Sequence, residues 1–430
     1  MLTLNVNFPL RNQGASNALA LDSLPRHRWY FVKEGFSPKL VEQAAATDEV
    51  GKGEVLLDPF SGSGTVPLTG ALAGLQALAF EVNPFLRFLS ATKLRQAAPS
   101  AFRTASRHIL REAERPVPSP LEGYSTFTEG NRWGRWLFPK RVLRSFEAGR
   151  RTIAKVDVEH RDLLQLALLG AAMDCCNAAR DGKCLRYHND WRNHQATDSH
   201  FRQRFEKRAE MIAADLDTAP LNGTPAFVIE GDARRLITAP SREKFRLCVT
   251  SPPYLNSFDY SDVYRPELFL GGFVDSNKSL MNVRLKTVRS HVQVSWERPQ
   301  KNNFGAIYGN CIEKIEEYVD DLWDTRIPIM IQAYFEDMET ILRGLRQRAH
   351  RNASVWLVVS TSAYAGVEVP VDLILAEIGQ RAGWFLREVG VLRYLRSSSQ
   401  HVKHVEEAER KSVPLRESVV IFDASKNRAR

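Results

Sequence analysis

The sequence predicts an α/β fold, a doubly wound mixed sheet with a mostly helical insertion. Short apolar runs alternate with helix-like segments up to about residue 96, and the alternation resumes at residue 226. Such alternation is typical of parallel strands covered by helices on both faces. Residues 97–222 interrupt the pattern, and the last two apolar runs, 384–394 and 417–422, are expected to be partly antiparallel strands.

The first strand–turn–helix unit follows directly after residue 54. An apolar run of the buried-strand type at residues 55–57 ends at Asp58-Pro59, because proline cannot donate a hydrogen bond to a sheet ladder. Residues 60–65 then form a turn with two glycines, which permit positive φ and a close approach of the backbone to a ligand. The alanine-rich helix expected over residues 66–74 directs its free N–H groups and its positive dipole end at this turn.

An acidic residue follows the turn at the distance expected for a nucleoside site. The next strand, residues 76–80, ends at Glu81, where doubly wound folds place an acid on ribose hydroxyls. The turn matches neither the dinucleotide pattern G-x-G-x-x-G nor the Gly-Lys-Ser/Thr of a phosphate-binding loop. A lone glycine turn is also found in tight connections without a ligand, but with Glu81 the pattern favours a nucleoside over NAD or ATP.

Two motifs resemble those of S-adenosylmethionine-dependent amino-methylating DNA methyltransferases. DPFSGSGT at residues 58–65, followed by EVNP at 81–84, resembles the cofactor motif of this family, and TSPPY at 250–254 resembles its catalytic motif. The resemblance covers most of the chain but not its middle. It implies a Rossmann-like class I methyltransferase fold with S-adenosylmethionine as cofactor. The cofactor-binding residues that it implies are Phe36, Ser37, Pro38, Asp58, Phe60, Ser61, Gly62, Ser63, Gly64, Thr65, Glu81, Val82, Asn83, Asp232, Ala233 and Ser251.

Three further assignments, Ser37, Pro38 and Asp232, also have a physical reason. Ser37 is a suitable N-cap and Pro38 a suitable first helical residue, so a helix is expected over residues 38–46, and the resemblance implies that it lines the methionine end of the cofactor. The strand expected over residues 226–230 ends just before Asp232, which by resemblance hydrogen-bonds the adenine amino group. An acid at the carboxyl end of a strand faces the ligand crevice; helix capping is the alternative role for Asp232.

The catalytic assignments are Ser251, Pro252, Pro253 and Tyr254, at the end of the strand expected over residues 245–250. An exocyclic amino group is a poor nucleophile because its lone pair is delocalised into the ring. The Ser251 hydroxyl and the Pro252 carbonyl can accept its hydrogens and restore lone-pair density for attack on the methyl sulfonium. Pro253 stiffens the turn, and Tyr254 offers a flat face on which a flipped base can stack. Direct transfer of this kind requires no metal and depends largely on positioning.

By resemblance, Ser-Pro-Pro-Tyr is typical of cytosine-N4 methylation, whereas Asp or Asn in the first position is typical of adenine-N6. Adenine-N6 methylation of DNA and amino-group methylation of RNA stay as alternatives, as does a nucleic-acid-binding protein without catalysis. Ring-carbon methylation is disfavoured because it needs a cysteine nucleophile, usually after proline, and the sequence contains no Pro-Cys. The resemblance also implies a restriction–modification or defence context, with a cognate endonuclease that forms no stable complex.

The composition indicates a nucleic-acid partner and no membrane span. The net charge is +9 and the pI about 9.3, which suits double-stranded DNA, although a merely basic protein has the same signature. No run of about 18 apolar residues occurs, and the N-terminus lacks a signal pattern. Five cysteines, an odd number, argue for a reducing compartment, so we expect a cytoplasmic protein.

The insertion is the first candidate for DNA recognition. Residues 101–220 contain 21 lysines and arginines against 16 acidic residues, a net charge of +5. Helices are expected over residues 163–175 and 201–216, and residues 132–136 (RWGRW) mix bases with aromatics. A solvated scaffold is the alternative role. The cysteines and histidines of residues 175–194 lack the spacing of a zinc site, and the bases of residues 180–183 fit an exposed loop better than a phosphate clasp.

The remaining segments carry weaker signals. Residues 1–25 are expected to be a loose arm, and the aromatics of residues 26–30 to pack rather than bind. Asp259 and Asp262 are equal candidates to receive a proton late in the reaction. Residues 295–305 (SWERPQKNNFG) are expected to be a mobile loop and a second candidate DNA contact. Further elements are a helix over 328–348, a strand over 353–360, a helix over 370–382 and a disordered basic tail.

We therefore divide the chain into five parts. They are residues 1–96, the N-terminal arm and cofactor-binding half of the methyltransferase domain; 97–222, the helical insertion; 223–272, the catalytic half; 273–327, an irregular basic loop region; and 328–430, the C-terminal part with its tail.

Overall fold

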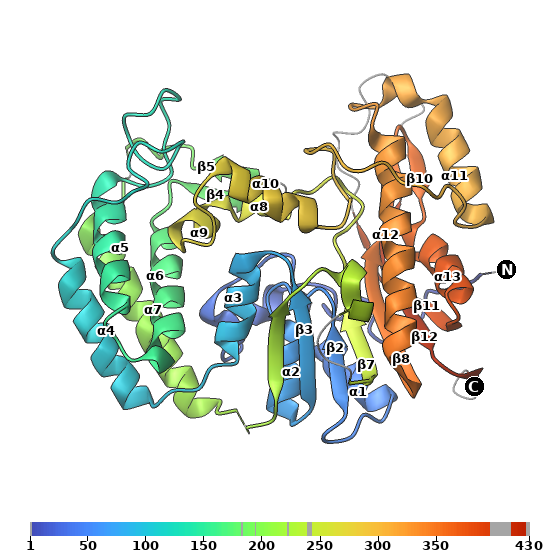
Figure 1. Cartoon of the computed structure of the whole chain (residues 1–430), viewed down its shortest axis with the longest axis horizontal. Helices are drawn as coiled ribbons and strands as arrows, with labels where there is room; N and C mark the ends of the chain where they lie inside the picture. The colour runs from blue at the N-terminus through green and yellow to red at the C-terminus, as the bar shows by residue number, and fades with distance from the viewer. Residues whose placement is uncertain are drawn as a thin grey trace.

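A mixed sheet forms the centre of the molecule (Figure 1). The computed structural model describes residues 2–181, 184–193, 195–221, 223–238, 243–395 and 414–426. Within them the sheet has eight strands in the order β1-β11-β12-β8-β7-β2-β3-β6. Their bounds are β1 (Leu4–Asn5), β2 (Val55–Asp58), β3 (Gln76–Glu81), β6 (Ala226–Glu230), β7 (Phe245–Thr250), β8 (Ala349–Ser360), β11 (Phe385–Leu395) and β12 (Leu415–Asp423).

The sheet confirms the predicted α/β class and its mixed strand directions. Strands β6, β3, β2, β7 and β8 run parallel, whereas β12 is antiparallel to both β8 and β11. Alternate residues of the central strands face opposite sides: Leu247 and Val249 join one core cluster, and Cys248 joins another. Helices pack into both clusters, which is the arrangement of a doubly wound, Rossmann-like fold.

The helices next to the sheet begin close to where the sequence predicts them. They are α1 (Pro38–Thr47), α2 (Thr65–Ala73), α3 (Pro84–Lys93), α12 (Ile327–Arg348) and α13 (Val371–Arg381). The Ser37 hydroxyl accepts a hydrogen bond from the Lys39 N–H at 3.3 Å and so caps α1 as predicted. α1 packs into the first cluster with Leu56 of β2, and α12 and α13 pack into the second.

The insertion between β3 and β6 is mostly helical, as predicted (Figure 1). It contains α4 (Pro99–Ala113), α5 (Lys140–Ile153), α6 (Val158–Asp174), α7 (Asp198–Thr218) and the hairpin of β4 (Ala178–Asp181) and β5 (Cys184–Tyr187). Its own core joins that of α3. The aromatics of residues 26–30 pack as expected, since Trp29 is only 1% exposed, and its indole N–H donates to Asp215 of α7 at 2.9 Å.

Two predictions about irregular segments are wrong. Residues 1–25 are not a loose arm, because β1 pairs with β11 and Phe8 is buried against Trp356. Residues 273–327 contain α10 (Asn277–Lys286) and α11 (Ala306–Glu317). Neither helix starts with the full capping-box pattern of Ser or Thr followed by Glu or Gln: α10 is capped by Ser276 but has Ser279 in place of the Glu or Gln, and α11 follows Gly305 without a side-chain cap.

Hydrogen bonds attach the segment expected to be a mobile loop, residues 295–305, to α12. The backbone N–H groups of Gln300 and Lys301 donate to Glu336 at 2.8 and 2.9 Å, and the Lys301 ammonium pairs with Glu339 at 2.7 Å. The charge of Lys301 is therefore neutralised within the protein.

Shorter elements complete the fold: α8 (Tyr260–Val263), α9 (Arg265–Leu270), β9 (Ser362–Tyr364), β10 (Val367–Val369) and the 3₁₀-helices η1 (Leu19–Asp22), η2 (His27–Trp29), η3 (Ala233–Thr238) and η4 (Val319–Asp321). All five cysteines are free. In the described part of the chain, no helix combines the length and apolarity needed to cross a bilayer. The expectations for Gly182-Lys183, His194 and the tail from residue 427 lie outside the described residues.

Candidate active site

A cavity of about 360 Å³ opens at the carboxyl ends of β2, β3 and β7. The turn after β2 and the turn after β7, about 190 positions apart in sequence, both line it. Parallel strands end at the same edge of a sheet, which explains how two distant motifs meet. Of the sequence-predicted residues, the cavity is lined by Phe36, Phe60, Ser61, Gly62, Ser63, Thr65, Glu81, Val82, Asn83, Asp232, Ala233, Ser251, Pro252, Pro253 and Tyr254.

The glycine turn is fixed in shape by its neighbours. Gly64 has φ +82°, and a Cβ there would lie 2.6 Å from the Ser90 hydroxyl of α3, so both conformation and packing require glycine. The ammonium of Lys93, at the end of α3, donates to the Ser63 carbonyl at 2.9 Å. Burial lowers the pKa of Lys93 to about 7. The turn is therefore held from behind by α3.

Glu81 lies at the end of β3 with both carboxylate oxygens engaged. Oε2 accepts from the Gly62 N–H at 2.8 Å and Oε1 from the Asn83 N–H at 2.9 Å. Burial raises the pKa of this carboxyl, and the backbone donors oppose that shift. A carboxylate offers about four lone-pair sites, so two acceptor sites remain for a ligand.

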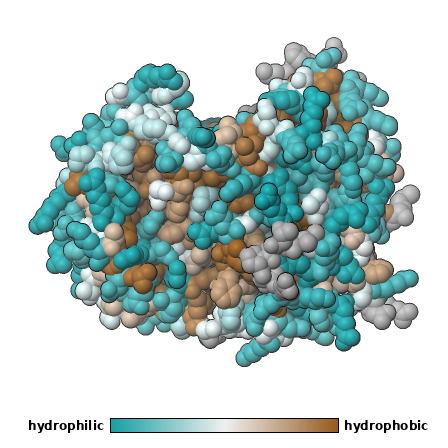
Figure 2. Space-filling model, viewed as in Figure 1, coloured by the Kyte–Doolittle hydropathy of each residue, from teal (hydrophilic) through white to brown (hydrophobic). Residues whose placement is uncertain are grey.

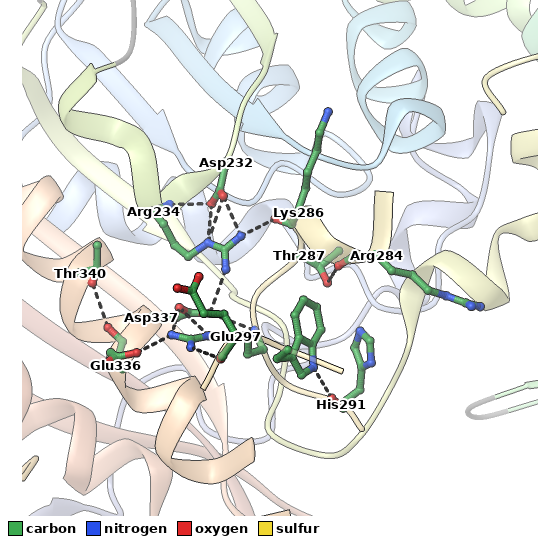
Figure 3. Close-up of polar contacts among 12 residues, drawn as sticks. Asp232, Arg234, Arg284, Lys286, Thr287, His291, Glu297, Glu336, Asp337 and Thr340 are labelled. Atoms are coloured by element: carbon green, nitrogen blue, oxygen red, sulfur yellow. Dashed lines mark hydrogen bonds and ion pairs between the residues drawn. The ribbon is translucent and has the colours of Figure 1, made fainter. Parts of the chain in front are cut away.

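Asp232 lines the cavity and belongs to an ionic network (Figure 3). Arg234 binds its carboxylate through Nη2 at 2.7 Å and reaches Asp337 of α12 at 3.3 Å. Asp337 in turn pairs with Arg289 at 2.6 Å. The Arg234 backbone N–H also donates to Asp232 at 2.9 Å, so the side chain both caps η3 and faces the cavity. The two roles foreseen for Asp232 are compatible.

Four residues of the predicted cofactor set do not line the cavity: Ser37, Pro38, Asp58 and Gly64. Ser37 is 2% exposed and its hydroxyl caps α1. Asp58 is 1% exposed, and its Oδ1 accepts from the Thr250 hydroxyl at 2.7 Å and from the Phe60 N–H at 3.0 Å. These residues support the wall from behind, and Asp58 connects the two motifs directly.

Burial raises the pKa of Asp58 to about 7, despite these two donors. A carboxyl with a raised pKa in the folded state lowers stability as the pH rises from its unfolded to its folded pKa. We therefore expect Asp58→Asn to gain stability relative to wild type between about pH 4 and pH 7, by on the order of 2–4 kcal/mol. Urea unfolding of both proteins across this pH range measures the difference, and a difference independent of pH would contradict the assignment.

The turn of residues 251–254 is anchored on its far side. The Tyr254 hydroxyl donates to Glu417 of β12 at 3.3 Å, and the Leu255 carbonyl accepts from the Tyr364 hydroxyl at 3.0 Å. Burial raises the pKa of Tyr254 far above its usual value, so the side chain stays a neutral donor. Phe258, Tyr260 and Tyr264 add an aromatic wall.

Neither aspartate considered as a proton acceptor reaches the cavity. Asp259 caps α8 and forms an ion pair with Arg284 at 2.7 Å, and Asp262 forms an ion pair with the same arginine at 3.4 Å. Besides Glu81, the acidic side chains Glu34 and Glu417 line the cavity near this position in the wall. Asn256, Tyr260 and Tyr264 belong to the polar-aromatic run of residues 255–272, which the sequence predicts as an active-site wall. The sequence analysis missed the wall residues Ser16, Asn17, Val32, Lys33, Glu34, Gly35, Leu86, Gly231, Phe258, Lys286, Thr287, Val288, Arg393 and Glu417 as site residues.

In sequence, the chain is similar to Type II methyltransferases. No protein-family model matches the chain. It is 23% identical over 393 residues to the Type II methyltransferase M.AvaI of Nostoc sp. and to that of Anabaena variabilis, covering 86% of this chain and 81% of each relative. It is 24% identical over 452 aligned residues to the Type II methyltransferase M.BsoBI of Geobacillus stearothermophilus, covering 90% and 85%.

Two solved structures share the general architecture only loosely. TrmN from Thermus thermophilus superposes with a TM-score of 0.28 and 10% identity, covering 90% of this chain and 48% of that one. The rRNA methyltransferase aviRa from Streptomyces viridochromogenes gives a TM-score of 0.30 and 12% identity, covering 97% and 94%. At these scores neither structure bears on the function of this chain. The similarity to Type II methyltransferases over most of the chain supports the S-adenosylmethionine-dependent DNA methyltransferase family that the two motifs resemble.

Proposed function

We propose that this chain transfers a methyl group from S-adenosylmethionine to the N4 amino group of cytosine in double-stranded DNA, with the base flipped out of the duplex. The observation that carries the proposal is the shared cavity, where the Gly62 turn with Glu81 meets the turn of Ser251–Tyr254. The relatives named as Type II methyltransferases support DNA as the substrate and a restriction–modification context.

The cavity wall fits the cofactor in its donor set. Glu81 has acceptor sites for the two ribose hydroxyls, and Asp232 can accept from the adenine amino group. The apolar side chains of Val82 and Val288 suit the faces of an adenine ring, and Phe36 lies beyond the glycine turn. S-adenosylmethionine supplies the electrophilic methyl group when it is bound.

The residues after β7 would act on the amino group. The Ser251 hydroxyl and the Pro252 carbonyl accept its hydrogens, which turns the nitrogen lone pair toward the methyl carbon. The new N–C bond forms as the C–S bond breaks, and the electron pair of that bond stays on sulfur. The amino nitrogen then carries a positive charge and loses a proton to solvent water, so a strong base is not required. Positioning of the two reactants supplies most of the rate.

The direct test is methyl transfer to defined nucleic acids. The purified protein is incubated with tritiated S-adenosylmethionine and duplex DNA, single-stranded DNA or RNA, and the products are digested to nucleosides. Label in N4-methylcytosine from duplex DNA is the expected result. Label in N6-methyladenine would replace cytosine by adenine as the target, and label in RNA alone would overturn the DNA proposal.

The insertion presents the surface that best fits DNA. Trp133, in the segment between α4 and α5, is 55% exposed, and the Arg132 guanidinium stacks on it at 4.4 Å. Trp323, near α11, is equally exposed at 54% but is flanked by Asp320, Asp321 and Asp324. These two regions form the two projections in Figure 1, and Figure 2 shows the outline notched between them. We infer that DNA contacts the projection of the insertion.

We expect Arg132→Ala combined with Trp133→Ala to weaken duplex binding about tenfold, because a phosphate contact of Arg132 and the packing of the Trp133 ring against the duplex are both lost. Electrophoretic mobility shift at two salt concentrations measures the change, and the slope of affinity against salt should fall by about one unit. Trp323→Ala is the matched control. A larger loss in Trp323→Ala would move the contact to the other projection.

A further inference from the structure

An arginine–glutamate pair lies in the cavity wall beside the catalytic turn. Arg393 of β11 and Glu417 of β12 are cross-strand partners, and the Arg393 Nε donates to the Glu417 Oε2. Glu417 is 4% exposed, whereas the Arg393 side chain is 36% exposed. The carboxylate is therefore buried, and the guanidinium extends from it toward the cavity.

The pair is connected to the catalytic residues by contacts. The Ser251 side chain neighbours the Tyr254 hydroxyl, which donates to the Glu417 Oε1 at 3.3 Å. Glu417 holds Arg393 through its other oxygen. Ser251, Tyr254, Glu417 and Arg393 thus form a continuous polar row along one cavity wall. From Ser251 the row extends past Tyr254 and Glu417 to Arg393.

The backbone at Arg393 is adapted to this position. The register of the β11–β12 ladder shifts between Val391, which is opposite Ser418, and Arg393, which is opposite Glu417. Such a bulge places two residues against one, and bulges occur next to active sites, where they redirect a side chain. A second arginine of β11, Arg387, lies at the other register shift of this ladder, between Leu386 and Glu388, but it pairs with Asp423 of β12 and with Asp48 and does not line the cavity. Lining the cavity therefore distinguishes Arg393, and the bulge alone does not.

We propose that Arg393, held by Glu417, reads the ring edge of the flipped base next to its amino group and so selects cytosine over adenine. The inference rests on the proposed function. The bond to Glu417 uses Nε and leaves the two terminal amino groups of the guanidinium outside it. Cytosine offers two acceptors in a row beside its amino group, N3 and O2, and a guanidinium fork can donate to both. Adenine offers N1 and then a C–H, which leaves one donor without a partner.

The test is a chemical double-mutant cycle on the site mapped in the methylation assay. Wild type and Arg393→Gln are compared on duplexes with cytosine or 3-deazacytosine at the target, the latter with C–H in place of N3. We expect Arg393→Gln to lose about tenfold to a hundredfold in kcat/KM on cytosine, the range for a hydrogen bond to a charged group. On 3-deazacytosine the variant should lose markedly less than on cytosine, because the ring acceptor is already absent.

The controls distinguish a direct contact between Arg393 and the base from a purely structural role of Arg393 in the sheet. Arg387→Gln removes an arginine from the same strand, so any loss in kcat/KM should be equal on cytosine and 3-deazacytosine. In Arg393→Gln, the affinity for S-adenosylmethionine should be unchanged. Equal losses by Arg393→Gln on cytosine and 3-deazacytosine would overturn this inference and leave the proposed function intact. A wild-type enzyme that methylates adenine and not cytosine would overturn both.

Discussion

Replacing Ser251 with alanine is expected to lower kcat by a factor of about a hundred or more and to leave the dissociation constant of S-adenosylmethionine within about twofold. The hydroxyl would act only on the amino group that is becoming a nucleophile, so its loss weakens the transition state and not the cofactor complex. Ser251 follows the last residue of β7 and is in the cavity wall, whereas the acceptors that we propose for the cofactor are Glu81 of β3 and Asp232. Single-turnover rates and calorimetric titration measure the two quantities.

Ser100→Ala is a matched control, because Ser100 is exposed in the first turn of α4. A variant Ser251→Ala with normal kcat would remove the hydroxyl from the mechanism and leave the Pro252 carbonyl as the remaining acceptor. A variant that instead loses cofactor affinity would place Ser251 in the cofactor site, the second role that the resemblance implies for it.

The sequence predicts the core of the site because each motif is contiguous. Residues 60–65 and 251–254 follow strands directly, and parallel strands bring both turns to one edge of the sheet whatever their separation in sequence. What the sequence predicts less well is which member of a motif lines the cavity. Asp58 lies in the cofactor-like motif, which predicts a residue that contacts the ligand. As the last residue of β2, however, its side chain is buried and accepts a hydrogen bond from the Thr250 hydroxyl.

The rest of the wall depends on tertiary pairing that no local pattern shows. Glu417 reaches the cavity because β12 pairs with β8 in a register that places Glu417 opposite Ser360, and Arg393 follows through the bulge in β11. A shift of one residue in either register would turn these side chains to the other face of the sheet. Glu34 arrives on the N-terminal segment, whose packing against the sheet the sequence analysis did not foresee.

The second large effect is expected at Glu81. Glu81→Ala should raise the dissociation constant of S-adenosylmethionine about a hundredfold, roughly 3 kcal/mol, because two hydrogen bonds from ribose hydroxyls to a charged acceptor are lost. Part of the loss comes from the turn itself, since Glu81 also accepts from the Gly62 N–H at 2.8 Å and the Asn83 N–H at 2.9 Å. Turnover at saturating cofactor should change much less than affinity, because neither partner of Glu81 belongs to the catalytic turn.

Glu230 provides a control on the neighbouring strand. It is opposite Glu81 in the β3–β6 register, but its side chain is 55% exposed, pairs with Lys286 at 3.4 Å and does not line the cavity. Glu230→Ala should therefore leave cofactor affinity unchanged in isothermal titration calorimetry. Equal effects of the two substitutions would indicate a general electrostatic contribution from the edge of the sheet. An unchanged affinity in Glu81→Ala would exclude the ribose assignment, and the cofactor would then have to be held by the glycine turn and Asp232 without the acid at the end of β3.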